Sequence, residues 1–250
     1  MLSSLKLLFG NKLGACDGEL GHVKDFYFDD QSWAVRYVVA DTGNWLPGRQ
    51  VLLSPHAFGG LPPDGKSLRV NLLRQQIADS PSIETHKPVS RQYEEAYHRY
   101  YGWPYYWEGD GLWGGMRGFP VLAVPPGFSP DAAAAPVVLP PGRADAHLRS
   151  AQAVNGYHLQ ATDGIVGHVC DFLMDDQSWA IGELVIKVGH RFTGREVRIP
   201  TGKVSRISYE ESKVYVNLTT GAVEHSAPYV LVPALGENSF KKAVAEILAP

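Results

Sequence analysis

Short apolar runs separated by polar turn residues occupy two stretches of the 250-residue chain. In the first stretch, Val23–Phe28 and Trp33–Ala40 flank the polar cluster Asp-Asp-Gln-Ser, which predicts a strand, a turn and a second strand. Residues 169–174 and 179–186 repeat this arrangement. Apolar residues then recur at every second position, which places them on one face of further strands. These positions are Val51, Leu53, Leu68, Val70 and Leu72 in the first stretch and Val197, Ile199, Val214, Val216 and Leu218 in the second.

The two stretches are copies of one sequence. Asp17–Ala34 reads DGELGHVKDFYFDDQSWA and Asp163–Ala180 reads DGIVGHVCDFLMDDQSWA, so 13 of 18 positions are identical at an offset of 163 − 17 = 146. The register continues without a gap, backwards to Ser4/Ser150 and forwards to Leu72/Leu218. The chain therefore contains two copies of one module. We expect about five short strands in each and no helix over the sheet, so that the sheet buries its apolar face by curling into a barrel.

The pattern DGxxGHVxDFxxDDQSWA resembles the PRC-barrel family, named after the cytoplasmic domain of the photosynthetic reaction-centre H subunit. A related barrel forms the C-terminal half of a bacterial ribosome-maturation factor. The resemblance covers both copies, roughly residues 5–80 and 146–227. It implies small antiparallel β-barrels that dock onto other proteins and share no catalytic site. The H subunit has a membrane helix and the maturation factor has a different N-terminal domain, so neither role is carried over.

These observations predict a mainly β protein of four parts. Residues 1–82 form the first PRC-type barrel, and residues 83–142 form an aromatic insert followed by a linker rich in Pro and Ala. Residues 143–235 form the second barrel, and residues 236–250 form a short amphipathic helix. Within the insert, Tyr93, Tyr97 and Tyr101 fall at helical spacing, which predicts a short helix ending at Gly102.

The aromatic insert is the candidate interaction surface, and it has no twin in the second copy. Tyr and Trp offer a large contact area with a polar tip and are common in binding hot spots. The insert either binds a partner or braces the two barrels. Stacking on nucleic acid requires a basic groove, and the insert holds few basic residues. The residues of this surface are Tyr97, Tyr100, Tyr101, Trp103, Tyr105, Tyr106, Trp107 and Trp113.

Acidic and glycine residues of the repeat have both a chemical and a structural interpretation. Adjacent carboxylates suit a hard cation, but Asp side chains also accept hydrogen bonds from backbone N–H groups in hairpin turns. The GxxG spacing is too short for a phosphate loop and favours a tight turn and a close strand approach at a barrel corner. We interpret these residues as turn residues that define the fold. They are Gly21, Asp25, Asp29 and Asp30, with Gly167, Asp171, Asp175 and Asp176 in the second copy.

Candidate catalytic residues have little support from their spacing. His22 and His168 occupy matching positions, where a proton relay and a shared strand edge are both consistent interpretations. Cys16 and Cys170 are not equivalent, since 170 − 16 = 154, and no histidine pair has a zinc-site spacing. The serines of the DQSW motifs lack the context of a nucleophile. We therefore expect no catalytic residue, cofactor or metal, and no enzymatic activity.

Composition narrows the class of protein further. The net charge is −3 and 44% of the residues are hydrophobic, which provides a buried core and gives nucleic acid no bulk attraction. Two cysteines form no disulfide framework, and no apolar run is long enough for a membrane helix. We expect a cytoplasmic, non-catalytic binding or scaffold protein whose partner is another protein or, in a homodimer, itself. The alternative is an accessory factor of a membrane-associated electron- or proton-transfer complex, as the H subunit resemblance implies.

Overall fold

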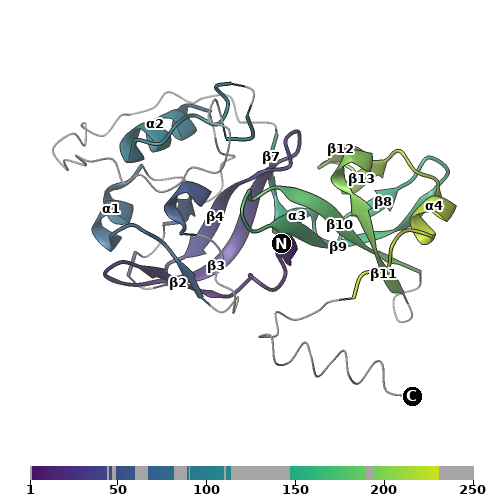
Figure 1. The fold of residues 1–250 in the computed structure, drawn as a ribbon, viewed down its shortest axis with the longest axis horizontal. Coiled ribbons are helices and arrows are strands. Elements are labelled where there is room, and N and C mark those ends of the chain that lie inside the picture. Colours follow the sequence, from purple (N-terminus) through teal and green to yellow (C-terminus); the bar gives the residue numbers. More distant parts are fainter. Residues whose placement is uncertain are drawn as a thin grey trace, which may run out of the picture.

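A computed structural model describes most of both copies and part of the insert. The description covers residues 2–43, 45–46, 49–59, 67–81, 89, 91–109, 111–113, 147–189 and 194–230. The predicted linker and C-terminal helix therefore lie outside the described residues. Within them the protein is mainly β, as predicted, with two sheets and a few short helices (Figure 1).

One sheet contains strands of the first copy. Its strands are β2 (Lys12–Ala15), β3 (Gly18–Asp29), β4 (Val35–Asp41), β5 (Val51–Leu53) and β6 (Ser67–Arg69), joined by β7 (Leu148–Ser150). They lie in the order β5-β4-β3-β2-β6, with β7 paired to β3. The second sheet contains β8 (His158–Gln160), β9 (Ile165–Asp175), β10 (Ile181–Val188), β11 (Arg195–Pro200), β12 (Val204–Ser208) and β13 (Lys213–Val216), joined by β1 (Leu2–Ser4). They lie in the order β11-β10-β9-β8-β13-β12, with β1 paired to β9.

The predicted hairpins are confirmed in both copies. β3 pairs antiparallel with β4, and β9 pairs antiparallel with β10. The two sheets also share a parallel pairing, because β2 pairs in parallel with β6 and β8 pairs in parallel with β13. Both sheets are open hydrogen-bonded paths in the part of the chain that is described, so a closed barrel stays a prediction.

The expectation that no helix covers these sheets is wrong. Helices α1 (Arg74–Asp79) and α4 (Thr220–Glu224) follow the last strand of each module, and α3 (Ala151–Val154) follows β7. Single-turn 3₁₀ helices span Pro55–Ala57 and Thr201–Lys203. Helices α1 and α4 are too short to show a periodic apolar pattern, and each buries one apolar side chain completely, Ile77 and Val223. The first turn of each helix is hydrogen-bonded to the aspartate of the DG motif of the repeat, Asp17 or Asp163.

The aspartate of that motif caps the helix in both modules. The Oδ1 atom of Asp17 accepts a hydrogen bond from the backbone N–H of Arg74 at 2.9 Å, and Asp163 accepts one from Thr220 at 2.7 Å. A carboxylate at a helix N-terminus satisfies an otherwise unpaired N–H and interacts favourably with the helix dipole. The hydrogen bonds at exposed Asp163 lower the pKa of its carboxyl group.

The two modules exchange their first strands. Ser4 lies opposite Leu173 in the pairing of β1 with β9, and Ser150 lies opposite Tyr27 in the pairing of β7 with β3. These two pairs are related by the 146-residue offset, so the register of the exchange is the same in both directions. The N-terminus accordingly lies between the two sheets (Figure 1). The predicted boundaries at residues 82 and 143 divide the sequence, but each sheet includes a strand from beyond them.

Buried aspartates receive the exchanged strands. Asp171 accepts hydrogen bonds from the Ser4 hydroxyl and the Lys6 backbone N–H, and Asp25 accepts them from Ser150 and Gln152. Both carboxylates also accept the N–H of the residue that follows them. Burial raises the pKa of Asp25 and Asp171, while these hydrogen bonds oppose that shift.

The centre of the pseudo-two-fold contact lies at Ala34 and Ala180, which form an antiparallel bridge. The backbone N–H of Val35 donates to the carbonyl of Trp179 at 2.9 Å, and the N–H of Ile181 donates to that of Trp33 at 2.7 Å. Both tryptophans have left-handed backbones, with φ of 57° and 58°. A non-glycine residue in this region is uncommon and is stabilised by its surroundings, which here are the other module.

Gly167 provides a test of the packing between strands. A Cβ atom at this position would lie 2.3 Å from the carbonyl oxygen of Lys187 on the neighbouring strand β10. We expect Gly167→Ala to lower the melting temperature by roughly 3 to 10 °C, because the backbones of β9 and β10 would have to separate. Gly202→Ala is the matched control, since a Cβ there meets nothing within 4 Å. Equal melting temperatures of the two variants, measured by calorimetry, would contradict the close approach.

Candidate functional site

The aromatic insert covers the open edge of the first sheet. Its helix α2 (Arg91–Tyr101) confirms the helix predicted from the tyrosine spacing, and Tyr93, Tyr97 and Tyr101 form its buried face. The Tyr97 hydroxyl donates to the carbonyl of Leu52 at 2.8 Å and accepts from the backbone N–H of Ser54 at 3.1 Å. One side chain thereby satisfies backbone groups of edge strand β5 that a further strand would otherwise pair.

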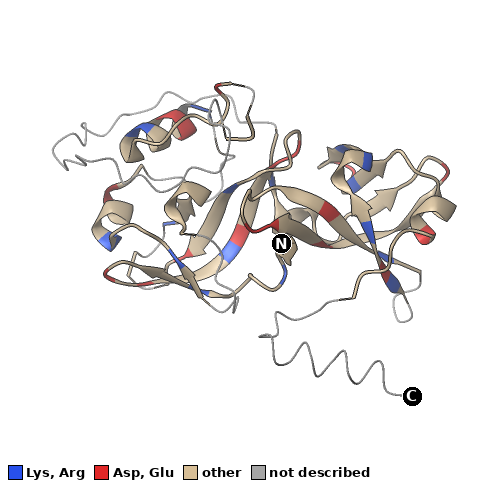
Figure 2. Cartoon of the chain, in the orientation of Figure 1, with Lys and Arg blue, Asp and Glu red and all other residues tan. Residues whose placement is uncertain are grey.

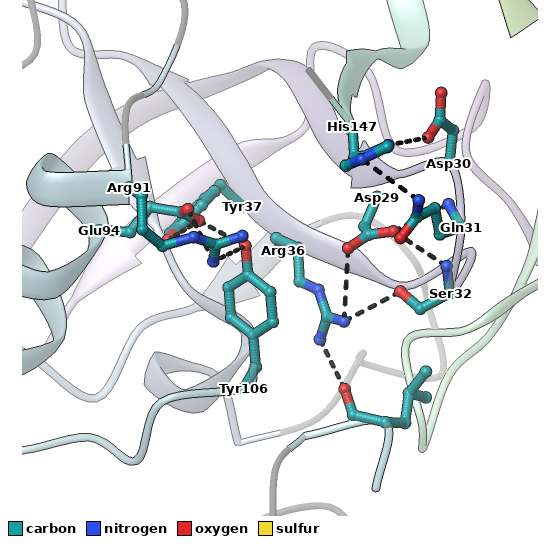
Figure 3. A network of polar contacts seen from close by, with 11 residues as sticks. Asp29, Asp30, Gln31, Ser32, Arg36, Tyr37, Arg91, Glu94, Tyr106 and His147 are labelled. Carbon is teal, nitrogen blue, oxygen red and sulfur yellow. Dashed lines mark hydrogen bonds and ion pairs between the residues drawn. The ribbon is translucent and has the colours of Figure 1, made fainter. Parts of the chain in front are cut away.

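A buried carboxylate of the insert binds the insert to the first sheet. Glu94 on α2 is 0% exposed. Its Oε1 atom accepts hydrogen bonds from the hydroxyls of Tyr37 at 2.8 Å and Tyr106 at 2.7 Å, and its Oε2 atom pairs with Arg91 at 3.2 Å (Figure 3). These contacts join strand β4, helix α2 and the loop after it. A buried charge with this many partners is stable in place but costly to leave unpaired.

Arg36 connects the same loop to the hairpin turn of the first module. Its guanidinium donates to the carbonyl of Leu112 at 2.6 Å and to the Ser32 hydroxyl at 2.9 Å, and lies 3.9 Å from Asp29 (Figure 3). It also lies 3.8 Å from the centre of the Tyr106 ring, a distance typical of a cation–π contact. Burial lowers the pKa of Arg36, although the neighbouring Tyr106 and Asp29 act in the opposite direction.

Two buried histidines lie in the same region, His56 of the first module and His98 of helix α2. Burial lowers the pKa of His56 and of His98 to about 4. The Nδ1 atom of His98 is 2.8 Å from the carbonyl oxygen of Pro104, while the ring of His56 stacks on Trp103 at 5.7 Å between centroids. Both imidazoles are therefore neutral at pH 7 and contribute to packing rather than to charge.

The insert also contacts the second module. The indole N–H of Trp113 donates to the carbonyl of Ser178 at 2.9 Å, in the turn between β9 and β10. The Trp113 side chain is buried and lies edge-on to His56, with the ring centroids 5.3 Å apart. Trp113 thus connects the insert, the first sheet and the second module.

The candidate interaction surface divides into an inner and an outer group. The inner group is buried and consists of Tyr97, Tyr101, Tyr106 and Trp113. The outer group is partly buried and consists of Tyr100, Trp103, Tyr105 and Trp107, which we call the outer aromatic ridge. Within this ridge the rings of Tyr105 and Trp107 stack at 4.9 Å, and Arg91 lies 4.3 Å from the Trp107 ring.

The predicted turn residues have different locations. Asp29 and Asp175 lie at the turn and accept hydrogen bonds from the two or three residues after them: Gln31 and Ser32, and Gln177 and Ser178. Burial by itself would raise the pKa of Asp175, but the hydrogen bonds from Ser178 act in the opposite direction, and the pKa is lowered to about 2. Asp176 also lies in its turn, at an intermediate exposure.

For Asp25 and Asp171 the interpretation as turn residues is wrong, because both lie within strands and bind the exchanged segments. Asp30 pairs with Arg149 at 2.6 Å and with His147 at 3.3 Å, so it also connects the modules. Gly21 and Gly167 lie within strands where a Cβ would meet a backbone carbonyl at 1.9 and 2.3 Å. The predicted close strand approach is therefore confirmed at both glycines, whereas the predicted tight turn is wrong because both lie within β3 or β9.

The candidate histidines and cysteines of the repeat are not among the described residues that contact the aromatic insert. His22 lies opposite Lys12 on β2, and His168 lies opposite His158 on β8. Cys16 is exposed, whereas burial, with the nearby carboxylates of Glu196 and Asp171, raises the pKa of the Cys170 thiol to about 12. Among the described residues, no three His, Cys, Asp or Glu side chains are grouped as metal ligands.

Arg36, Glu94 and His98, the buried polar side chains under the aromatic rings, were not among the residues predicted from the sequence. Arg36 interrupts an otherwise apolar strand, and this is the one local signal that could have marked it as a partnered buried charge. Glu94 and His98 lie among polar neighbours on a helix that resembles a solvated one. Only the packing of α2 on β4 brings their side chains into the interior.

Comparison with known protein families gives a match within the second module. Residues 157–223 match the family model of the PRC-barrel domain, which confirms that family for the second module. The match does not extend to the first module. No curated protein matches the chain. No helix within the described ranges is both long and apolar enough to span a membrane.

The buried histidines make stability dependent on pH. Unfolding restores their ordinary pKa near 6.5, so below that pH the unfolded chain binds protons that the folded chain does not. We expect their contribution to stability to be complete above pH 6.5 and to be lost as the pH falls towards 4. His56→Phe removes one of the two imidazoles that bind a proton on unfolding. The free energy of unfolding of this variant should therefore fall less between pH 6.5 and pH 4 than that of the parent protein. Urea unfolding at a series of pH values measures this, with exposed His158→Gln as control; identical pH dependence of all three proteins would contradict it.

Glu94 provides a test of how the insert is attached to the first sheet. Removing its carboxylate takes the acceptor at 2.7 Å from the buried Tyr106 hydroxyl and leaves the Tyr37 hydroxyl only the Nε2 atom of His98, at 3.5 Å. We expect Glu94→Ala to lower the free energy of unfolding by about 3 kcal/mol or more. Glu95→Ala, at the neighbouring partly buried position, should change it by less than about 1 kcal/mol. Chemical denaturation compares the two variants, and a similar loss for both would show that Glu94 does not hold the insert.

Proposed function

We propose that the chain is a non-catalytic protein-binding or scaffold protein built of two PRC-barrel modules. A PRC-barrel domain suggests a role in protein interaction, and one is present at residues 157–223. The proposal extends this family to the first module. Its support is the 146-residue repeat, together with the equivalent order and pairing of β5-β4-β3-β2-β6 in the first sheet and β11-β10-β9-β8-β13 in the second.

The observation that carries the proposal is the division of the aromatic insert. Its inner rings are buried on the first sheet, and this fixes the outer aromatic ridge on a rigid base. Aromatic side chains that are ordered before binding lose little conformational entropy when a partner covers them. Such residues are also typical of the few positions that dominate protein–protein affinity. The insert is thus a brace on its inner side and a candidate partner surface on its outer side.

The polar groups under the insert support a non-catalytic role. Glu94 is held by two tyrosine hydroxyls and an arginine, and Arg36 by a carbonyl and a hydroxyl. Their hydrogen bonds join β4, α2 and the following loop. Basic and acidic residues are interspersed over both halves of the described chain (Figure 2). This distribution favours a protein partner over a nucleic acid. A stoichiometric metal ion in the purified protein, measured by elemental analysis, would contradict the proposal.

A pull-down comparison tests the role of the outer aromatic ridge. We expect Tyr105→Ala/Trp107→Ala to lose at least about tenfold of a captured partner protein, because hot-spot truncations typically cost more than 1 kcal/mol each. Tyr209→Ala is the control, since Tyr209 is 50% exposed and belongs to the second module. The bait is the full chain in an extract of the native host, with captured proteins quantified by mass spectrometry.

The same experiment separates the proposal from the alternative role. Proteins that are lost with the ridge variant but kept with Tyr209→Ala support a binding surface on the insert. Capture of the same proteins by all three baits would show that the ridge is not that surface. Recovery of a membrane electron- or proton-transfer complex with every bait would instead support an accessory factor of such a complex.

A further inference from the structure

The contact between the two modules is made twice by equivalent residues. Ser4 on Asp171 and Ser150 on Asp25 are related by the 146-residue offset, as are the two backbone hydrogen bonds that flank Ala34 and Ala180. Each module therefore carries both a donor strand and an acceptor for the strand of the other. An arrangement in which residue i contacts j and j contacts i is isologous, the form of contact that joins two-fold symmetric dimers.

These contacts do not depend on which chain supplies each module. The exchanged strands and their acceptors lie in residues 2–34 and 148–181, and the connection between modules runs through residues 82–146. A first module can form the same hydrogen bonds with the second module of another chain. The contact energies are equal in both arrangements, so protein concentration and the effective concentration set by the connection decide between them.

We propose that this face also joins two copies of the chain, with the first module of each copy paired to the second module of the other. The partner that the surface fits is thus a second copy of this chain, in a reciprocally exchanged dimer. Pairing of unlike modules is favoured because Trp113 of the insert donates to Ser178 of the second module, and the second module has no insert of its own. Phe28 also packs on Phe172 across the face, with ring centroids 5.4 Å apart.

The dimer presents two inserts on one assembly. A partner with two binding sites would gain affinity from this arrangement without any new contact at either site. Formation of the dimer requires β1 and β7 to leave their acceptors and the left-handed turns at Trp33 and Trp179 to separate. Exchange between monomer and dimer is accordingly slow once the chain is folded, and refolding sets the proportion of each.

A disulfide across the pseudo-two-fold centre reports which chains supply the modules. Ala34 and Ala180 form a pair without mutual hydrogen bonds, since the bonds run between Val35 and Trp179 and between Ile181 and Trp33. Such pairs have Cα atoms about 4.5 Å apart, within the range that a disulfide spans. The test protein is the full chain with Ala34→Cys and Ala180→Cys in a Cys16→Ser/Cys170→Ala background.

The experiment refolds this variant from urea at protein concentrations from about 1 µM to about 1 mM, the upper end of which reaches the order of effective concentration that linked modules have. Size-exclusion chromatography with light scattering separates monomer from dimer, and each fraction is oxidised and run on a non-reducing gel. We expect the dimer fraction to rise severalfold with refolding concentration and its disulfide to join two chains. The monomer should carry the same disulfide within one chain.

Three results would overturn the proposal. A dimer whose disulfide lies within each chain associates through another surface, and the absence of a dimer at the highest concentration excludes exchange. The variant with Ala34→Cys alone is the control for pairing of like modules, and an interchain disulfide in it would contradict the pairing of unlike ones. Equal urea midpoints for the reduced monomer of the variant and the parent protein would establish that the substitutions leave the fold intact, because the disulfide itself raises the midpoint of the oxidised monomer.

Discussion

The structure depends on two buried carboxylates, Asp25 and Asp171, that receive the first strand of the opposite module. Each accepts a serine hydroxyl and two backbone N–H groups, which compensates for a burial that raises its pKa. If either strand left, its acceptor would keep a buried carboxylate without its main partners. The exchange consequently stabilises both sheets together, and it connects the two copies more directly than the chain between them does.

The aromatic insert makes this near-symmetric arrangement asymmetric. Residues of the first module that hold it, such as Arg36 and Tyr37, have Gly182 and Glu183 as their twins in the second module. The insert covers edge strand β5 through Tyr97, whereas in the second module residues 227–229 run beside β11 and bond its backbone. The two copies thus protect the same strand edge by different means, one with side chains and the other with backbone. The proposed partner surface belongs to the first of these.

Much of the fold could be predicted from the sequence. The hairpins, the third strand and the helix with buried Tyr97 follow from local patterns, because strand and helix periods are properties of neighbouring residues. The short helices α1 and α4 were missed because five or six residues carry no measurable period. For the candidate site, the aromatic residues were evident, but Glu94, His56 and His98 were not. Their burial results from packing between segments far apart in the chain.

The sequence by itself determined that one module occurs twice and that its strands form antiparallel hairpins, and its motif resembles the PRC-barrel family, whose domain model matches residues 157–223. Identical spacing in the two copies is enough for this, since equal local patterns fold in equal ways. Only the tertiary structure decided what Asp25 and Asp171 do and which rings of the insert are buried. A carboxylate in a strand and one in a turn look alike in a sequence, because the difference lies in the donors that distant segments bring to them.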